Sequence, residues 1–322
     1  MSERKFKCDF LNHALDFEVD TIRHCCQTSH LGGGETVFVE KFDGTNFDWV
    51  EIFNIKKELS SQMAAGNIPD KCVGCAYIEE VDEIDSEEYI SSVWLNHFNK
   101  CNCFCSYCEK TIGCDEYGYV EEYDILPVFR EMLDKKILRN GGHIIFGGGE
   151  PTILKGFEEL LELCYQNDIQ RYIVHSSGIK YSPALARGLK SKEIDLIISL
   201  DAGTPETYKK IKNIDCFSQV CENIKRYVQE AENNAMRVRS KFIIVPEIND
   251  SIEEIDKWYN LSINELGVKT LTIDIEKTWF VKNRDCLPEY IVEMIRHVRD
   301  LCQRDGIKLF YYEQALLIEN LI

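Results

Sequence analysis

Six short apolar runs, each followed by an amphipathic stretch, fill most of the chain after residue 90 and constrain its fold more than any other feature. The strand candidates are 92–98, 143–146, 171–175, 194–200, 238–245 and 271–275. The helix candidates are 121–139, 156–167, 183–191, 215–234, 251–266 and 287–304, and a further strand is expected at 308–312. Strands that alternate with helices pair in parallel through right-handed crossovers. The pattern therefore predicts an α/β fold, either an open sheet or a barrel, with its working residues at the carboxyl ends of the strands.

The residues before this pattern are organised differently. Their one long helical pattern lies at 50–65, and the acidic run 79–88 is expected to be a solvated linker. We therefore predict two domains, 1–88 and 89–322. In the second domain, the helix at 251 begins with a capping box that runs from Ser251 to Glu254. The helix 121–139 would bury one face, formed by Ile125, Phe129, Met132 and Leu133.

The charge and hydropathy of the chain exclude several classes of protein. Its 37 Lys and Arg face 55 Asp and Glu, a net charge of −18 that repels phosphate backbones and argues against general binding of DNA or RNA. Its aliphatic runs are far shorter than the roughly 20 residues that a membrane-spanning helix needs. The first residues lack the apolar segment of a secretory signal. We expect a soluble, cytoplasmic protein.

The chain contains 15 cysteines, an unusual number for a protein expected in a reducing compartment. An odd count without an export signal argues against a disulfide scaffold, so clustered cysteines are first interpreted as metal or iron–sulfur ligands. The clustered cysteines are Cys8, Cys25, Cys26, Cys72, Cys75, Cys101, Cys103, Cys105, Cys108 and Cys114. The remaining five are expected to be small buried apolar residues: Cys164, Cys216, Cys221, Cys286 and Cys302.

The loop after the first strand of the alternating pattern carries Cys101, Cys105 and Cys108 in the spacing C-x3-C-x2-C. Three thiolates can hold three irons of a cubane cluster and leave the fourth iron without a protein ligand. An open metal position can bind a substrate or cofactor. The alternative is a zinc knuckle that uses four of Cys101, Cys103, Cys105, Cys108 and Cys114.

The next strand ends in a glycine turn that continues Gly147-Gly148-Gly149-Glu150-Pro151. Glycines let a ligand approach the backbone closely, and the Glu150 carboxylate can accept hydrogen bonds from an ammonium group. With the cysteine spacing one strand upstream, this turn makes the chain resemble the radical S-adenosylmethionine (SAM) superfamily over roughly residues 90–280. The resemblance implies a partial (β/α)6 TIM-like barrel. It also implies a [4Fe–4S] cluster whose open iron binds SAM, and an electron donor such as flavodoxin or ferredoxin.

The resemblance assigns site residues by position. Cys101, Cys105 and Cys108 would hold the cluster, and Cys103 falls at a variable position. Tyr107 would lie beside the adenine of SAM. The methionine amine would meet the turn formed by Gly148, Gly149, Glu150 and Pro151. The ribose and carboxylate would meet Ser199 and Asp201, and the ribose would also meet Ser177. Asp201 has an alternative role as the N-cap of a helix at 205–211. His175 is expected to be an interior histidine, and Lys241 and Glu276 would point into the barrel without an assigned role.

The N-terminal cysteines Cys8, Cys25, Cys72 and Cys75 supply the four thiolates of a closed iron–sulfur or zinc site. Their spacing resembles the SPASM/twitch modules that hold auxiliary clusters in many radical SAM enzymes, with Asp20 where those modules have Gly. The module precedes the barrel here and lacks its later cysteines, so one auxiliary cluster is expected. Zinc remains an alternative metal, and Cys26 an alternative to Cys25. Other substitutes are His13 and His24, which are more simply explained as exposed loop residues, and 31–35 is expected to be a hairpin turn.

The family's chemistry defines the predicted function. Reductive cleavage of SAM would give a 5′-deoxyadenosyl radical that abstracts hydrogen from an unactivated C–H bond, an oxidoreductase-type reaction. We expect a peptide or protein substrate, which would be oxidised, cross-linked or epimerised with help from the auxiliary cluster. One alternative is a dehydrogenase or epimerase of a sugar, cyclitol or other small molecule, and another is a non-catalytic metal-binding interaction protein. Cys114 is a candidate hydrogen-atom donor.

Overall fold

The computed structural model describes residues 4–25, 39–42, 44, 47–73, 75, 77–82, 88–108 and 123–319. Cys26, Cys114 and the turn expected at 31–35 lie outside these described residues. The chain forms two compact units. The first comprises Met1–Asn99, Val120–Gly148 and Glu162–Arg171, and the second comprises Lys100–Tyr119, Gly149–Leu161 and Tyr172–Ile322.

The first unit is built on strands from both the N-terminal region and the start of the alternating pattern. Its elements are β1 (Lys5–Lys7), α1 (Asp9–His13), β2 (Ala14–Phe17), β3 (Thr21–Arg23), β4 (Val39–Lys41), α2 (Trp49–Ala64), the 3-10 helix η2 (Asp70–Cys72), β5 (Glu79–Val81), β6 (Ile90–Leu95), α5 (Leu126–Asp134) and β7 (Leu138–Phe146). Five of the strands lie in the order β4-β3-β2-β6-β7. The pairs β2–β6 and β6–β7 are parallel, so the N-terminal residues extend the sheet that β6 begins.

The sequence predicts a linker over the acidic run 79–88, but part of this run forms a strand. Residues Glu79–Val81 form β5, which pairs antiparallel with β1. Lys7 stands directly opposite Glu79, and their charged groups lie 3.5 Å apart. Opposite charges on facing strands stabilise such a pair, which explains why an acidic segment becomes a strand here.

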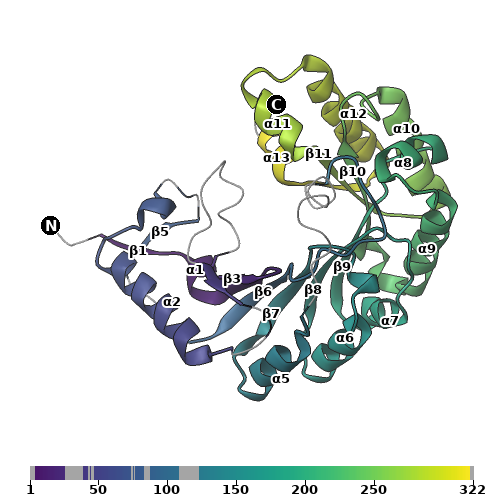
Figure 1. Ribbon diagram of the computed structural model, residues 1–322. Helices are drawn as coiled ribbons and strands as arrows, with labels where there is room; N and C mark the ends of the chain where they lie inside the picture. Colours follow the sequence, from purple (N-terminus) through teal and green to yellow (C-terminus); the bar gives the residue numbers. More distant parts are fainter. Residues whose placement is uncertain are drawn as a thin grey trace. The chain divides into compact units, whose positions relative to one another are not determined.

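The rest of the chain alternates strands and helices. Its elements are the 3-10 helix η3 (Pro151–Ile153), α6 (Phe157–Gln166), β8 (Arg171–Ser176), α7 (Pro183–Ser191), β9 (Glu193–Ser199), α8 (Pro205–Lys212), α9 (Phe217–Glu230), the 3-10 helix η4 (Glu232–Arg237), β10 (Val238–Ile244), α10 (Ile252–Asn260), the π-helix η5 (Leu261–Glu265), β11 (Thr270–Ile275), α11 (Lys277–Asn283), the 3-10 helix η6 (Arg284–Cys286), α12 (Glu289–Asp305), β12 (Lys308–Tyr311) and α13 (Glu313–Glu319). The pairs β9–β10, β10–β11 and β11–β12 are parallel, with helices α7, α9 and α12 packed on these strands (Figure 1).

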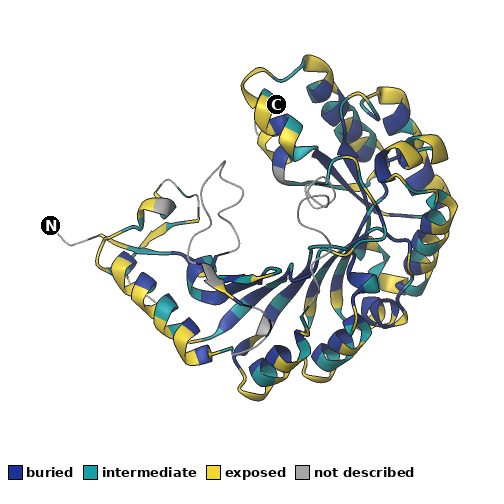
Figure 2. Ribbon diagram, in the orientation of Figure 1, coloured by how far each residue is buried: buried dark blue, intermediate teal, exposed yellow. Residues whose placement is uncertain are grey.

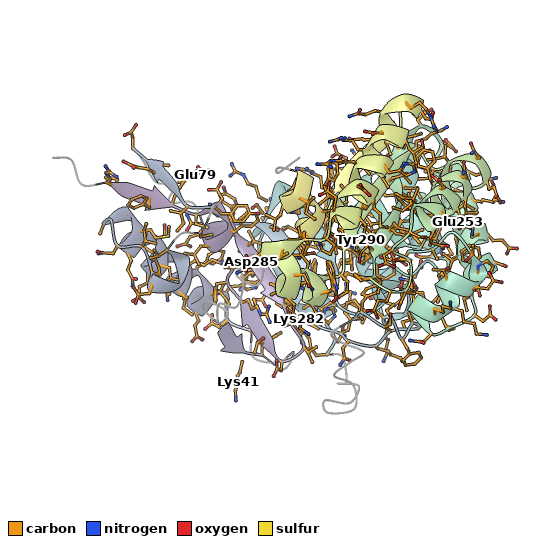
Figure 3. All side chains as sticks on the ribbon, turned by 90° about the horizontal axis from the view of Figure 1, so that it is seen from above. Lys41, Glu79, Glu253, Lys282, Asp285 and Tyr290 are labelled. Atoms are coloured by element: carbon orange, nitrogen blue, oxygen red, sulfur yellow. The ribbon has the colours of Figure 1, made fainter. Side chains whose placement is uncertain are left out.

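The predicted α/β fold is confirmed: β6 to β11 and the helices between them are the six strand–helix repeats of a partial TIM-like barrel. The helices are amphipathic, with buried faces towards the strands (Figure 2). In α10, Ile255 and Trp258 are buried, whereas Glu253, labelled in Figure 3, forms an exposed ion pair of 2.6 Å with Lys257. The Ser251 half of the predicted capping box is confirmed, since the Ser251 hydroxyl accepts a hydrogen bond from the Glu254 amide, whereas the Glu254 carboxylate accepts one from the Gly203 amide.

One predicted helix is longer than the helix that forms. The stretch expected at 121–139 contains α5, which ends at Asp134. Lys136 has a left-handed φ of 53°, and the Ile137 amide bonds back to the Met132 carbonyl, as at many helix ends. Strand β7 begins directly afterwards, at Leu138. Of the expected apolar face, Ile125, Phe129 and Met132 are buried and Leu133 is half-buried.

The predictions for the scattered cysteines hold only in part. Cys164 and Cys302 are buried and Cys216 and Cys221 are half-buried, but Cys286 is exposed. Cys286 ends the short helix η6, none of whose three residues is buried in the described part of the structure. No helix in the described ranges is both long and apolar enough to cross a membrane.

Candidate functional site

The loop of residues 101–108, called the cysteine loop below, is fixed to the end of helix α8 by main-chain hydrogen bonds. The Phe104 amide donates to the Lys212 carbonyl at 3.0 Å, and the Ser106 amide donates to the Ile211 carbonyl at 2.8 Å. The last carbonyls of a helix have no partner within it. Here the cysteine loop satisfies the carbonyls of Ile211 and Lys212, so the end of α8 supports the loop.

Within the cysteine loop, the buried Cys103 thiol links two of the predicted cluster ligands. A hydrogen bond from Cys103 is the main reason that the pKa of Cys105 falls to about 6; burial opposes this shift, and the Lys212 charge adds to it. The same type of bond lowers the pKa of Cys101. The thiolate is the form of cysteine that ligates metals. Two of the three predicted ligands, Cys101 and Cys105, therefore ionise to the metal-binding thiolate more readily than an ordinary cysteine.

The donor set of the cysteine loop fits an iron–sulfur cluster. Among the residues that the structure describes, no group of three or more His, Cys, Asp and Glu side chains is arranged to hold a metal ion. A cluster places its cysteines on different irons, so its ligands need not gather around one point as those of a single ion do. The half-buried Cys101, Cys105 and Cys108 supply three thiols on one short loop, the set that such a cluster needs.

Glu150 is a buried carboxylate surrounded by donors. Its Oε1 accepts hydrogen bonds from the Thr152 amide (3.1 Å), the Thr152 hydroxyl (2.6 Å) and the Ser176 hydroxyl (2.9 Å). Its Oε2 accepts from the Ser177 amide at 2.5 Å. The Ser177 hydroxyl in turn donates to Asn102 Oδ1 at 2.9 Å. Glu150 and Ser177, both predicted to contact SAM, thus belong to one network that reaches the cysteine loop.

The glycine turn needs glycine at one position in particular. Gly148, in the first unit, has a φ of +76°, and a Cβ there would lie 2.6 Å from the Phe98 carbonyl oxygen. Both the backbone conformation and the close approach exclude larger residues. Gly149 and Pro151 follow in the second unit, where Pro151 begins η3 with Glu150 as its N-cap.

Asp201 lies at the centre of a buried polar cluster. Its Oδ2 accepts hydrogen bonds from the Tyr107 hydroxyl at 2.7 Å and from Lys212 Nζ at 2.5 Å. Its Oδ1 accepts from the Ile243 amide at 2.8 Å. The alternative role of Asp201 as a helix cap is wrong, because Thr204 caps α8 through its hydroxyl.

Lys212 is a site residue that the sequence did not reveal. Although burial opposes its charge, the neighbouring Asp201 and Cys105 hold the pKa of Lys212 well above its usual value. Its sequence neighbours Lys209 and Lys210 are exposed members of the same helix. Nothing in the local pattern separates Lys212 from them, and only its place at the helix end, beside the cysteine loop, could have signalled its role.

The other barrel residues occupy different surroundings. Half-buried Ser199 ends β9, and half-buried His175 lies 3.4 Å from the Tyr312 hydroxyl, as expected for an interior histidine. Lys241 is buried, 3.6 Å from the Asp274 carboxylate. Glu276 does not serve as an interior charge: it caps α11 by accepting hydrogen bonds from the amides of Thr278 and Trp279.

The four N-terminal cysteines are near enough to affect one another electrostatically, although no three of them are among the described side chains arranged to hold a single metal ion. Cys8 and Cys25 share a buried cluster with Leu11, Leu59 and Met63. Burial, with smaller contributions from Cys25 and Cys75, raises the pKa of Cys8 to about 11. Burial also raises the pKa of Cys72 to about 11, with smaller contributions from the other three thiols. Metal uptake here must therefore displace protons from buried thiols.

The loops around this cysteine cluster are tied by a second buried lysine. Lys56, on α2, donates to the carbonyls of Leu11 (2.8 Å), Ala14 (2.7 Å) and His24 (3.2 Å). The expectation that His13 and His24 are exposed is wrong, because both are buried. His13 stacks on Tyr89, and the His24 main chain is held by Lys56.

Comparisons with known proteins identify a matching family model and several similar sequences. The radical SAM superfamily model matches residues 95–261. GTP 3′,8-cyclase of Petrotoga mobilis is 29% identical over 177 residues, which cover 52% of this chain and 50% of that protein. The probable GTP 3′,8-cyclase of Saccharolobus islandicus is 28% identical over 206 residues, covering 62% of this chain and 63% of that protein. The matches thus span about half to two thirds of these relatives.

Solved structures agree on the fold. Streptococcus suis SuiB has a TM-score of 0.52 at 13% identity, over 82% of this chain and 54% of that chain. SuiB bound to its precursor peptide SuiA has a TM-score of 0.50 at 12% identity, over 96% of this chain and 72% of that chain. The family model covers more than half of the 322 residues, and it includes the cysteine loop and the Glu150 turn. The chain therefore belongs to the radical SAM superfamily of enzymes.

Proposed function

We propose that this enzyme abstracts hydrogen from an unactivated C–H bond of a peptide or protein, and that its N-terminal cysteines hold an auxiliary iron–sulfur cluster. The observation that carries the first part is the placement, in one compact unit, of the three-cysteine loop, Glu150 and the Asp201–Lys212 pair. The cluster and SAM, when bound, supply the one-electron chemistry that cleaves SAM and removes the hydrogen atom.

The chain's own residues would bind and orient these groups. Cys101, Cys105 and Cys108 would hold three irons, and α8 would keep their loop in place through its terminal carbonyls. The Glu150 carboxylate would accept a hydrogen bond from the SAM ammonium group, in addition to those it already accepts from the protein. The Tyr107 ring would contact the adenine while its hydroxyl remains bonded to Asp201.

The charge of the molecule supports a peptide over a polyanionic substrate. A net charge of −18 repels a nucleoside triphosphate. The buried lysines in the described part of the second unit, Lys212 and Lys241, lie 2.5 and 3.6 Å from carboxylates. The fold similarity to peptide-bound SuiB over 96% of this chain also supports this substrate class.

A small-molecule substrate is the second candidate. It is favoured by the GTP 3′,8-cyclases, whose sequences are more similar to this chain than that of SuiB is. Their aligned segments leave more than a third of each relative unmatched, so their substrate does not transfer with the alignment.

For the N-terminal site, the proposal rests on the grouping of Cys8, Cys25, Cys72 and Cys75. An iron–sulfur cluster with four cysteine ligands has no open iron, so we assign it to electron transfer rather than to substrate binding. Zinc uses the same four-thiolate set in structural sites, and iron analysis distinguishes the two metals.

The substrate can be tested by following the abstracted atom. Anaerobically reconstituted enzyme is incubated with SAM, reductant and either a synthetic peptide library with deuterated side chains or deuterated GTP. We expect deuterium in 5′-deoxyadenosine from the peptide library, and none when Cys101→Ala replaces the wild type. Deuterium transfer from GTP alone would contradict the peptide proposal and favour the small-molecule candidate.

A further inference from the structure

We propose that Lys212 is a positioning residue that fixes the cysteine loop and offsets the Asp201 charge beside the cluster. The inference rests on the proposed placement of a [4Fe–4S] cluster at Cys101, Cys105 and Cys108. Lys212 is 2% exposed, and its Nζ donates to the Asp201 carboxylate at 2.5 Å and to the Tyr107 hydroxyl at 3.0 Å. Tyr107 lies between two of the ligands in sequence.

Lys212 holds the cysteine loop from two directions. Its main-chain carbonyl accepts the Phe104 amide at 3.0 Å, while its side chain reaches Tyr107 further along the loop. The next residue, Asn213, adds a hydrogen bond from Nδ2 to the Phe104 carbonyl at 2.7 Å. One helix end thus contacts the loop on both sides of Cys105.

Asp201, which accepts the hydrogen bond from Lys212 Nζ, is itself held by hydrogen bonds to the barrel. Asp201 has a left-handed φ of 57°, a conformation that Asp adopts more readily than most other non-glycine residues. Its Oδ1 accepts the Ile243 amide, and its carbonyl accepts Asn249 Nδ2 at 2.9 Å. Lys212 therefore ties the loop to the ends of β9 and β10.

The charges explain why the lysine is needed. A cluster held by thiolates is negatively charged, and Asp201 places a second buried negative charge nearby. An uncompensated buried charge is costly. Lys212 compensates Asp201 within hydrogen-bonding distance, so the cluster does not face an unpaired carboxylate.

The test compares Lys212→Met, Lys212→Arg and Asp201→Asn/Lys212→Met with the wild type. Lys209→Met is the matched control, because Lys209 lies on the same helix with its side chain 63% exposed. For each reconstituted protein, we would measure the midpoint potential of the cluster at the cysteine loop by EPR-monitored titration, and the rate of iron loss to a chelator. Circular dichroism of the apo-protein reports whether the variant folds.

We expect Lys212→Met to lose iron about 10-fold faster than the wild type and to show a more negative midpoint potential. Lys212→Arg should rescue the potential, and Lys209→Met should change neither quantity. The double variant should return the potential towards that of the wild type, because it removes both charges, but should still lose iron quickly.

The inference is overturned if folded Lys212→Met keeps the wild-type potential and iron retention. If Lys212→Met does not fold, the double variant decides: wild-type iron retention there would overturn the positioning role. A wild-type protein that takes up no iron at the cysteine loop would instead overturn the proposed function and, with it, the basis of this inference.

Discussion

The main-chain amide of Ser177, after β8, donates a 2.5 Å hydrogen bond to Oε2 of Glu150, which follows β7. Three further donors, from Thr152 and Ser176, bond to Oε1. Both carboxylate oxygens are therefore in use before any ligand binds. This arrangement makes the glutamate part of the scaffold as well as a predicted contact for SAM.

Replacement of Glu150 by Gln should destabilise the protein although the shape of the side chain is nearly unchanged. The amide NH2 group would face N–H or O–H donors on whichever side it lies, and a buried unsatisfied donor costs about 1–3 kcal/mol. Chemical denaturation of apo-protein measures this loss. Glu222→Gln, at an exposed position of α9, is the control and should change stability little. Equal stability of Glu150→Gln and wild type would contradict the network.

Lys56→Met should also destabilise the protein, by on the order of 3 kcal/mol, because three carbonyls would lose their buried donor. The adjacent Lys57 is exposed on the same helix, so Lys57→Met provides a matched comparison. Thermal or urea unfolding of the two variants measures the difference. If Lys57→Met proved as harmful as Lys56→Met, the anchoring role of Lys56 would be wrong.

The auxiliary site predicts a specific loss of iron. Reconstituted Cys72→Ala/Cys75→Ala should bind about half of the wild-type iron if each site holds a similar cluster. Iron and zinc analysis of the purified protein checks this. Cys221→Ala/Cys286→Ala removes two cysteines outside both sites and should leave the iron content unchanged. Unchanged iron in Cys72→Ala/Cys75→Ala would rule out an auxiliary cluster at these residues.

His143 should make the free energy of unfolding of the apo-protein fall at acidic pH. Burial, with a smaller effect of Arg171, lowers the pKa of His143 below the 6.5 of an unperturbed histidine. Below pH 6.5 the unfolded chain then binds a proton more readily than the folded chain, so stability falls as the pH drops from 6.5. His143→Gln should show a shallower decline between pH 7 and 5 in urea denaturation. Parallel declines in the two proteins would refute this contribution.

Much of the fold was predictable because its signals are local. The apolar runs that become β6 to β11 and the Ser251 cap depend on residues a few positions apart. The three-cysteine spacing and the glycine turn are equally local. Gly148 illustrates this, since its left-handed backbone requires glycine whatever the distant sequence is.

The residues that escaped prediction depend on distant partners. Lys212 and Lys56 look like ordinary surface lysines of amphipathic helices, and their burial follows only from Asp201 and from the carbonyls around Cys8 and Cys25. The acidic run became a strand because β1, more than 70 residues earlier, places lysines opposite it. Composition within a short window cannot reveal such pairings.

The most direct test of the account is SAM cleavage by anaerobically reconstituted protein with a strong reductant, scored as 5′-deoxyadenosine. The control is the Cys101→Ala/Cys105→Ala/Cys108→Ala variant, which keeps the N-terminal cysteines. We predict product from the wild type and none from the variant. Full iron loading of the wild type with no 5′-deoxyadenosine, or equal product from both proteins, would contradict the assignment of the cysteine loop.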